Sequence, residues 1–392
     1  MTRSSEILAS LPSDTLVAAL ELIDFMLGEA LLLADADDVL IAMSERIHAA
    51  GVPLERATSI VSLLHAEAVA SARFWELGKG TRSFLFPYSD DSGEGYAHSP
   101  AADVHRTGQW VDLWLPETPD DRYGIVAELK QDGYTQYVMA PVFMKMGRNG
   151  TFSFATRAPE GFSKTDLAFL RAVFPALAAC QDILATSRSM QEVLRIYVGE
   201  EPHRRILSGD VHRGDVMHIR AVILLADMRR FTELTAEMSA RAATDLLNAY
   251  FDCVVPPVEE VGGEVLKFMG DGVLAIFRVQ DGEEDACERA LVAAREVLAR
   301  VRQRSGEPTF DVGIALHAGE VAFGNVGAGM RLDYTVIGRD VNLVARLAGL
   351  CSSLDEPLLV SSQFRTRSRI PGRSCGAHRL KGLSQLEIVY AV

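Results

Sequence analysis

The sequence predicts an α+β protein with two domains, each a sheet covered by helices. The chain has 392 residues, enough for two or three domains of ordinary size. Segments with apolar residues at helical spacing alternate with short strand-like runs. Hydrophobic residues make up 48% of the chain and charged residues 23%, which is typical of a globular protein.

The first half is predicted to open with helices and to continue into strands. Helices are expected at residues 14–33, 36–50 and 54–76. A polar loop, PYSDDSGEGYAHSP, precedes the strand-like runs QWVDLWL, YTQYVMAPVFM and GTFSFATRA. Asn149 and Gly150, between the last two runs, are typical of a hairpin turn.

A long apolar helix is predicted to close the first half. Ser163 and Asp166 form a capping-box-like pair at its start. Pro175 is expected to kink or divide it. Its part from about residue 183 to 198 is interpreted as a connecting helix that can pair with its copy in a dimer, although it holds fewer than three heptads.

The second half is predicted to be a ferredoxin-like domain. The strand AVILLAD is followed by a helical segment, the hairpin EVLKFMGDGVLAIF and the helix EEDACERALVAAREVLARVRQR. Strand-like runs and the helix GRDVNLVARLAGL come next, and strand–helix–strand–strand–helix–strand order is typical of such a sheet. The predicted domains are residues 1–182 and 219–392, joined by a helical linker at 183–218.

Charge, cysteine and hydropathy patterns exclude several classes of function. A net charge of −14 argues against binding nucleic acid, which needs a basic face. The five cysteines are scattered and include no CxxC pair, which favours a reducing compartment. There is no signal-peptide pattern, and the apolar stretch at residues 16–33 holds three acidic residues. We therefore expect no membrane span and a cytoplasmic protein.

Two aspartates stand where strands end or turn. Asp227 ends the apolar run LLAD, and Asp271 lies in the turn MGDG. Magnesium prefers a few carboxylates plus phosphate oxygens and water, so such positions suit a metal–nucleotide site. After Asp227 a helix begins at Phe231 and Thr232, whose free N–H groups can hold phosphate oxygens. Taken singly, each aspartate is better explained as a cap or turn residue.

Five stretches of the second half together carry a family resemblance. They are ADMRRFTELT, GGEVLKFMGDGVLAIF, GIALHAGEVAFGNVG, DYTVIGRDVNLVARL and HRLKGL. In this order and spacing, the segment resembles the catalytic domain of class III nucleotidyl cyclases, the adenylyl and guanylyl cyclases. Several matches at consistent spacing are more specific than any one of them.

The resemblance implies a metal site and a base site. Asp227, Asp271 and the backbone carbonyl of Met228 match ligands of two Mg²⁺ or Mn²⁺ ions per active site. Lys267 matches the lysine that contacts adenine, and Thr335 matches the second base-selecting residue, as in a threonine-bearing subgroup. Guanylyl cyclases usually carry glutamate and cysteine or serine at these two positions.

The resemblance also implies the residues that act on ribose and phosphate. Asn342 and Arg346 match the residues that orient the ribose and stabilise the transition state, and Lys381 matches the lysine that holds the terminal phosphates. Cyclisation passes through a highly anionic transition state, to which each preorganised donor can contribute on the order of 3 kcal/mol. Arg230 is a departure, because many relatives have glycine there.

The function implied is conversion of ATP to 3′,5′-cyclic AMP and pyrophosphate. Class III sites lie between two catalytic domains, so a chain with one complete set is expected to form a homodimer with two equivalent sites. Lys267 and Asp271 would then serve different sites, and a local ion pair between them is the competing interpretation. The alternative functions are a guanylyl cyclase and a catalytically weak nucleotide- or ligand-sensing dimerisation module.

The first half loosely resembles an α/β GAF-type sensor domain, which implies control of the cyclase by a small-molecule ligand. This is analogy at the level of the fold. His65, His98, His105 and Cys180 are weak candidates for binding haem or a metal. Six aromatic residues can either line a ligand pocket or form a core: Phe74, Trp75, Trp110, Trp114, Tyr134 and Tyr137.

Overall fold

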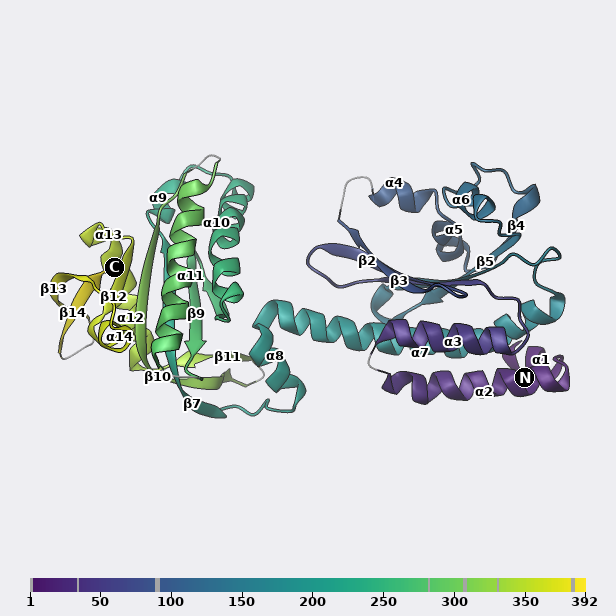
Figure 1. Cartoon of the computed structure of the whole chain (residues 1–392), viewed down its shortest axis with the longest axis horizontal. Helices are drawn as coiled ribbons and strands as arrows, with labels where there is room; N and C mark the ends of the chain where they lie inside the picture. Colours follow the sequence, from purple (N-terminus) through teal and green to yellow (C-terminus); the bar gives the residue numbers. More distant parts are fainter. Residues whose placement is uncertain are drawn as a thin grey trace. The chain divides into compact units, whose positions relative to one another are not determined.

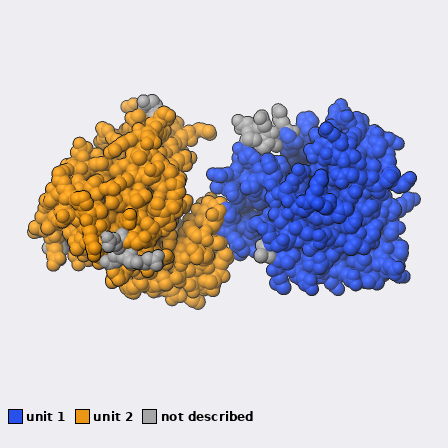
Figure 2. Space-filling view, in the orientation of Figure 1, with its two compact units in different colours: residues 1–193 blue, residues 194–392 orange. Residues whose placement is uncertain are grey.

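The chain folds as two units, residues 1–193 and residues 194–392, coloured separately in Figure 2. The computed structural model describes residues 3–33, 35–88, 92–280, 283–305, 309–329, 331–381 and 385–392. Each unit has its own sheet and its own apolar core, so the mixed helix-and-strand fold predicted for both halves is confirmed.

The first unit is built on a six-stranded antiparallel sheet in the order β3-β2-β1-β6-β5-β4. The strands are β1 (Arg56–Ser62), β2 (Ala68–Glu76), β3 (Gly80–Pro87), β4 (Val111–Trp114), β5 (Gln136–Phe143) and β6 (Asn149–Thr156). Helices α2 (Ser13–Leu27), α3 (Ala36–Ala49) and α7 (Lys164–Val198) cover one face, and α4 (Ser92–Ala97), α5 (Pro100–Thr107) and α6 (Val126–Gln131) lie over the other (Figure 1). Short helices α1 (Arg3–Ala9), η1 (Glu29–Leu32), η2 (Leu115–Glu117) and η3 (Lys145–Gly147) complete this unit.

Helix α7 begins at the predicted capping box. Asp166 N–H donates to Ser163 Oγ at 3.1 Å, and Ser163 N–H donates to Asp166 Oδ2 at 2.7 Å, which confirms the motif. Pro175 does not divide the helix. Within the described ranges α7 is also the one helix long and apolar enough to cross a membrane, with a mean hydropathy of 1.5 over its most apolar window. Its apolar face packs in the core of the first unit.

The predicted helix at residues 54–76 is wrong, because this segment forms β1 and β2. The two strands pair antiparallel, with Ile60 opposite Ala72. Since β1 lies inside the sheet and is buried along most of its length, its residues do not alternate between apolar and polar. Its β-branched residues Thr58, Ile60 and Val61 favour a strand.

Two further boundaries in the first unit differ from the prediction. The helix expected over residues 14–33 ends at Leu27, and η1 follows after Gly28. The segment predicted as the polar loop PYSDDSGEGYAHSP contains helix α4, while residues 89–91 lie outside the described part of the chain.

The turn between β5 and β6 also differs from the prediction. Met146 and Gly147 adopt left-handed φ values of 62° and 72°, and they make the turn. Asn149 and Gly150 are already paired with β5 as part of β6. The Asn-Gly hairpin signal was therefore misplaced by a few residues.

The second unit contains an eight-stranded sheet in the order β13-β14-β12-β10-β7-β9-β8, with β11 paired to β10. Its strands are β7 (Val216–Met228), β8 (Glu264–Met269), β9 (Gly272–Arg278), β10 (Val312–Ala328), β11 (Arg331–Ile337), β12 (Leu358–Ser361), β13 (Arg373–Arg379) and β14 (Leu386–Ala391). Its helices are α8 (Glu200–Leu207), α9 (Phe231–Thr235), α10 (Ala240–Glu260), α11 (Glu283–Gln303), α12 (Arg339–Ala348), α13 (Leu350–Leu354) and α14 (Ser362–Ser368).

Two helix layers sandwich the sheet of the second unit. Helices α10 and α11 pack on one face, and α12 packs on the other (Figure 1). The order β7, α10, β8, β9, α11, β10 is the predicted strand–helix–strand–strand–helix–strand order. Strands β12, β14 and β13 extend the sheet beyond what the sequence predicts, and helix α14 lies between β12 and β13 in the chain.

The predicted β8–β9 hairpin is confirmed, with two details added. Met269 pairs with Gly272, so Gly270 and Asp271 form the turn. The register shifts between Val265, which faces Ala275, and Lys267, which faces Leu274. Residue 266 is therefore an extra residue in β8, a β-bulge.

Candidate active site

Two carboxylates meet at one edge of the second sheet. Asp227 is the penultimate residue of β7, and Asp271 sits in the β8–β9 turn. Strands β7 and β9 pair with Ala226 opposite Val273, which brings Asp227 next to Gly272. A Cβ at Gly272 would lie 3.6 Å from Asp227 Oδ1, so the strands approach closely here. The two aspartate side chains are hydrogen-bonding neighbours.

The electrostatics of this pair favour a cation. Partial burial, then the charge and hydrogen bond of Asp271, raise the pKa of Asp227 to about 6. Asp227 is exposed to solvent, so the charge of the neighbouring carboxylate is an important part of the rise in its pKa. A divalent ion between the two groups would relieve their repulsion.

Tyr250 on α10 lies near enough to the carboxylates to feel their charges. The residue is fully buried, and its hydroxyl has no hydrogen-bond partner within the described residues. Burial, and then the charges of Asp227 and Asp271, raise its pKa well above the ordinary value. Sequence reasoning missed Tyr250, because a tyrosine on the apolar side of an amphipathic helix has the pattern of a core residue.

Met228 and the start of α9 follow Asp227 directly. The Met228 side chain lies in the core, and Phe231 packs partly against the same core. Arg230 adopts a left-handed conformation, with φ of 57°. Glycine adopts such a φ without steric cost, which accounts for the glycine that the family pattern has at this position. Arg230 adopts the same conformation with a side chain. Thr232 is exposed in the first turn of α9.

Lys267 and Thr335 form a second part of the site. Lys267 Nζ donates to Asp333 Oδ2 at 2.8 Å, so its ion pair is with β11 and not with Asp271 in its own hairpin. Thr335, two residues from Asp333, is buried, and its hydroxyl has no hydrogen-bond partner in the described part of the chain. Asp333 was not predicted, because its contact with Lys267 joins residues 66 positions apart.

Asn342, Arg346 and Lys381 are all exposed. The first two lie four residues apart on one side of α12, whose other side is buried through Leu343 and Leu347. Lys381 follows β13, and the two residues after it in the LKGL motif, 382 and 383, lie outside the described ranges. No hydrogen bond or ion pair between described residues joins these three side chains to Asp227 or Asp271.

A buried histidine fixes the start of α12. His317 Nδ1 lies 2.8 Å from Ser361 Oγ, and its Nε2 lies 3.6 Å from Asp340 Oδ1. Asp340 Oδ2 accepts the Glu320 N–H at 2.9 Å. The contact with His317 is the main cause that lowers the pKa of Asp340. His317 is therefore a packed strand residue that positions the helix carrying Asn342.

The weak ligand candidates of the first unit are dispersed. His105 Nε2 lies 2.8 Å from the Gly150 carbonyl, His65 lies beside Glu192, and Cys180 is in the core. Across the described ranges no three His, Cys, Asp or Glu side chains gather as they would around a metal.

The comparisons with known proteins concern the second unit. The family model described as "Adenylate and Guanylate cyclase catalytic domain" matches residues 217–361. An "Adenylate cyclase" of Anabaena cylindrica is 31% identical over 163 residues, 40% of this chain and 31% of that protein. An uncharacterized protein of Mycobacterium tuberculosis is 38% identical over 150 residues, 38% of this chain and 26% of that protein. This chain thus spans less than a third of either relative.

Solved cyclase structures are also similar. The adenylyl cyclase CyaB from P. aeruginosa is 29% identical, with 45% of this chain and 95% of that chain covered and a TM-score of 0.41. The guanylyl cyclase Cya2 is 26% identical, with 46% and 94% covered and a TM-score of 0.37. Residues 217–361 thus match the model of adenylyl and guanylyl cyclase catalytic domains. The similar proteins include both adenylyl and guanylyl cyclases.

Proposed function

We propose that this protein is an adenylyl cyclase that converts ATP to 3′,5′-cyclic AMP and pyrophosphate. The contact between Asp227 and Asp271 at one strand edge carries this proposal, because it is the arrangement that a metal–nucleotide complex needs. The family match of the surrounding residues supports it.

The donor set fits a divalent cation that is completed by substrate. Among the described residues, no third acidic, histidine or cysteine side chain gathers with the two carboxylates, which leaves room for phosphate oxygens and water. Asp227 and Asp271, with the Met228 carbonyl, would hold two Mg²⁺ or Mn²⁺ ions. Bound there, the ions would neutralise phosphate charge and favour ionisation of the ribose 3′-hydroxyl.

The protein's own residues would position the reacting groups. The 3′-oxygen bonds to the α-phosphorus, the bond from the α-phosphorus to the bridging oxygen breaks, and pyrophosphate leaves. Asn342 orients the ribose, while Arg346 and Lys381 donate charged hydrogen bonds to the developing negative charge. The N–H groups of Phe231 and Thr232 face the phosphates from the start of α9.

The proposed site is shared between two copies of the chain. Arg346 and Lys381 are exposed and are not bonded to the aspartate pair of their own chain, which is what a site completed by a partner requires. A two-fold homodimer then holds two equivalent sites. In each, one chain supplies the aspartates and the other supplies Lys267, Asn342, Arg346 and Lys381.

Adenine is the proposed base. Lys267 offers a donor for the ring nitrogen N1. The Thr335 hydroxyl, which has no partner among the described residues, offers an acceptor for the N6 amino group. A guanylyl cyclase is the second candidate, because the similar proteins include cyclases of both kinds. A side-by-side assay with ATP and GTP decides between them.

The first unit is proposed to regulate the cyclase as a GAF-like sensor. Its six-stranded antiparallel sheet with helices on both faces supports this role by analogy. In this proposal residues 1–182 bind a ligand and residues 183–218 transmit the effect to residues 219–392.

Purified protein, Mn²⁺ and ATP test the proposal. Cyclic AMP and pyrophosphate should form in equal amounts, and Asp227→Ala should reduce the rate by about a hundredfold or more while the melting temperature is retained. Absence of any cyclic nucleotide from ATP or GTP would contradict the proposal.

A further inference from the structure

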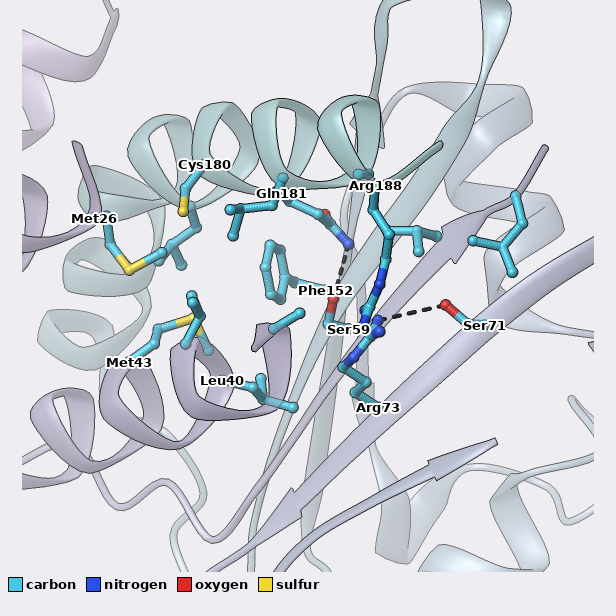
Figure 3. Close-up of a pocket in the computed structure, with 17 residues that line it drawn as sticks. Met26, Leu40, Met43, Ser59, Ser71, Arg73, Phe152, Cys180, Gln181 and Arg188 are labelled. Carbon is cyan, nitrogen blue, oxygen red and sulfur yellow. Dashed lines mark hydrogen bonds between the residues drawn. The ribbon is translucent and has the colours of Figure 1, made fainter. Parts of the chain in front are cut away.

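A cavity of about 60 Å³ lies inside the first unit, between the sheet and helices α2, α3 and α7 (Figure 3). This volume holds about four waters, or a molecule of roughly similar size. The cavity belongs to a different unit from the cyclase residues and plays no part in the chemistry proposed above.

One end of the cavity is apolar. Met26, Met43 and Cys180 gather there, and each is at most 1% exposed. Leu40 and Leu177 also line this part. Methionine side chains adapt to the shape of a bound group, so this end suits a short alkyl chain.

The other end is cationic. Arg73 from β2 and Arg188 from α7 lie together there (Figure 3). Arg73 Nη1 donates to Ser71 Oγ at 3.4 Å, which is a long contact. Burial, and then the charge of Arg188, lower the pKa of Arg73. Two guanidinium groups this close favour an anion that accepts hydrogen bonds from both.

Two acidic residues lie near the arginines, but they do not use all of the guanidinium N–H donors. Asp37 Oδ1 lies 3.1 Å from Arg73 Nε and offsets part of its charge. Asp35 accepts the Asp37 N–H at 3.0 Å and so caps α3. Arg188 makes no hydrogen bond or ion pair with another described residue, so its guanidinium is available to a ligand.

An unsatisfied acceptor lies between the two ends. Gln181 is 7% exposed, and its Nε2 donates to Ser59 Oγ at 2.9 Å and to the Ile60 carbonyl at 3.1 Å. These two bonds fix the orientation of the amide group. Within the described residues, Oε1 has no hydrogen-bond partner. A buried acceptor of this kind is stabilised by a donor, which a ligand hydroxyl can supply.

We propose that this cavity binds a short-chain hydroxycarboxylate. Its carboxylate lies between Arg73 and Arg188, its hydroxyl donates to Gln181 Oε1, and its alkyl end contacts Met26 and Met43. The order alkyl, hydroxyl, carboxylate follows the order of apolar, acceptor and cationic groups along the cavity (Figure 3).

The test uses the full-length protein with ¹³C-labelled methionine methyl groups and three probes: 3-hydroxybutyrate, butyrate and inorganic phosphate. We expect 3-hydroxybutyrate to shift the Met26 and Met43 signals saturably, while the other methionines serve as internal references. Butyrate should bind about five- to tenfold more weakly, because it lacks the hydroxyl. Phosphate should leave both signals unchanged, because it has no alkyl end.

Matched arginine variants locate the carboxylate. Arg188→Gln should weaken binding of 3-hydroxybutyrate by about tenfold or more, because a charged hydrogen bond is lost. Arg82→Gln, an exposed change on the neighbouring strand β3, should leave binding unchanged. Melting temperatures of both variants check that the fold is intact.

Three outcomes would overturn the proposal. One is the absence of a saturable shift with 3-hydroxybutyrate. The second is equal binding of butyrate or phosphate, which would remove the hydroxyl or alkyl assignment. The third is unchanged binding by folded Arg188→Gln. Because the readout is ligand binding in the first unit, none of these outcomes depends on cyclase activity.

Discussion

The ion pair between Lys267 and Asp333 predicts a defect in substrate binding that is separate from catalysis. Asp333→Ala removes the acceptor that lies 2.8 Å from Lys267 Nζ. The two side chains are 32% and 60% exposed, so solvent screens the pair, which contributes about 0.2–1 kcal/mol. We expect a similarly small loss of stability. Less order in Lys267 should raise KM for ATP by up to about fivefold and leave kcat nearly unchanged.

A second ion pair, whose side chains are exposed to a similar extent, supplies the control. Arg300 Nη2 lies 3.0 Å from Glu260 Oε1, and these side chains are 30% and 59% exposed. Glu260→Ala, between α10 and α11, should cause the same small loss of stability in urea denaturation but no change in KM. Steady-state assays that give equal KM values for Asp333→Ala and Glu260→Ala would refute the prediction that Asp333 positions Lys267. A change at Asp333→Ala that mainly lowers kcat would refute it as well.

Three further predictions follow from the second unit. Lys267→Ala and Asp271→Ala should each be nearly inactive, and an equal mixture should recover about a quarter of the wild-type rate, because half of the dimers are mixed and each has one intact site. No recovery after confirmed subunit exchange would contradict a shared site. Arg230→Gly should raise the free energy of unfolding by about 0.5–1 kcal/mol in urea denaturation, since it relieves a φ of 57°; a loss of stability would refute the strain. The lowered pKa of Asp340 should stabilise the fold above its ordinary value of 3.8, and this contribution should disappear as pH falls through the lower folded value. Urea denaturation from about pH 5 to about pH 3 should therefore show a smaller decline for Asp340→Asn than for wild type, and equal declines would count against it.

The sequence predicts best where local pattern and burial agree. The β8–β9 hairpin was predicted because apolar strands flank a glycine-rich turn, and the α7 capping box depends on residues only three apart. The error over residues 54–76 arose because β1 is buried on most positions and lacks an alternating pattern. One of the two strands that flank β1 is β6, which is distant in sequence, so periodicity alone did not reveal this pairing.

Part of the candidate site could also be predicted from the sequence. The family resemblance implied that Asp227 and Asp271 bind the same metal ions, and adjacent strands bring these two residues together. Tyr250 and Asp333 were not foreseen, because each reaches the site through tertiary contacts that leave no local pattern. The cavity of the first unit is lined by residues of six separate elements, α2, α3, β1, β2, β6 and α7, and has no sequence motif.

Because of the β-bulge in β8, the position of Lys267 depends more on the number of residues in the hairpin than on their identity. Side chains alternate between the faces of a strand, so the extra residue 266 sets the face on which Lys267 lies. Deletion of one residue there would turn Lys267 away from Asp333 while Asp271 kept its place in the turn. Apolar substitutions at exposed positions of this hairpin should be tolerated far better than a single insertion or deletion, and natural variation among relatives should avoid gaps between residues 264 and 272.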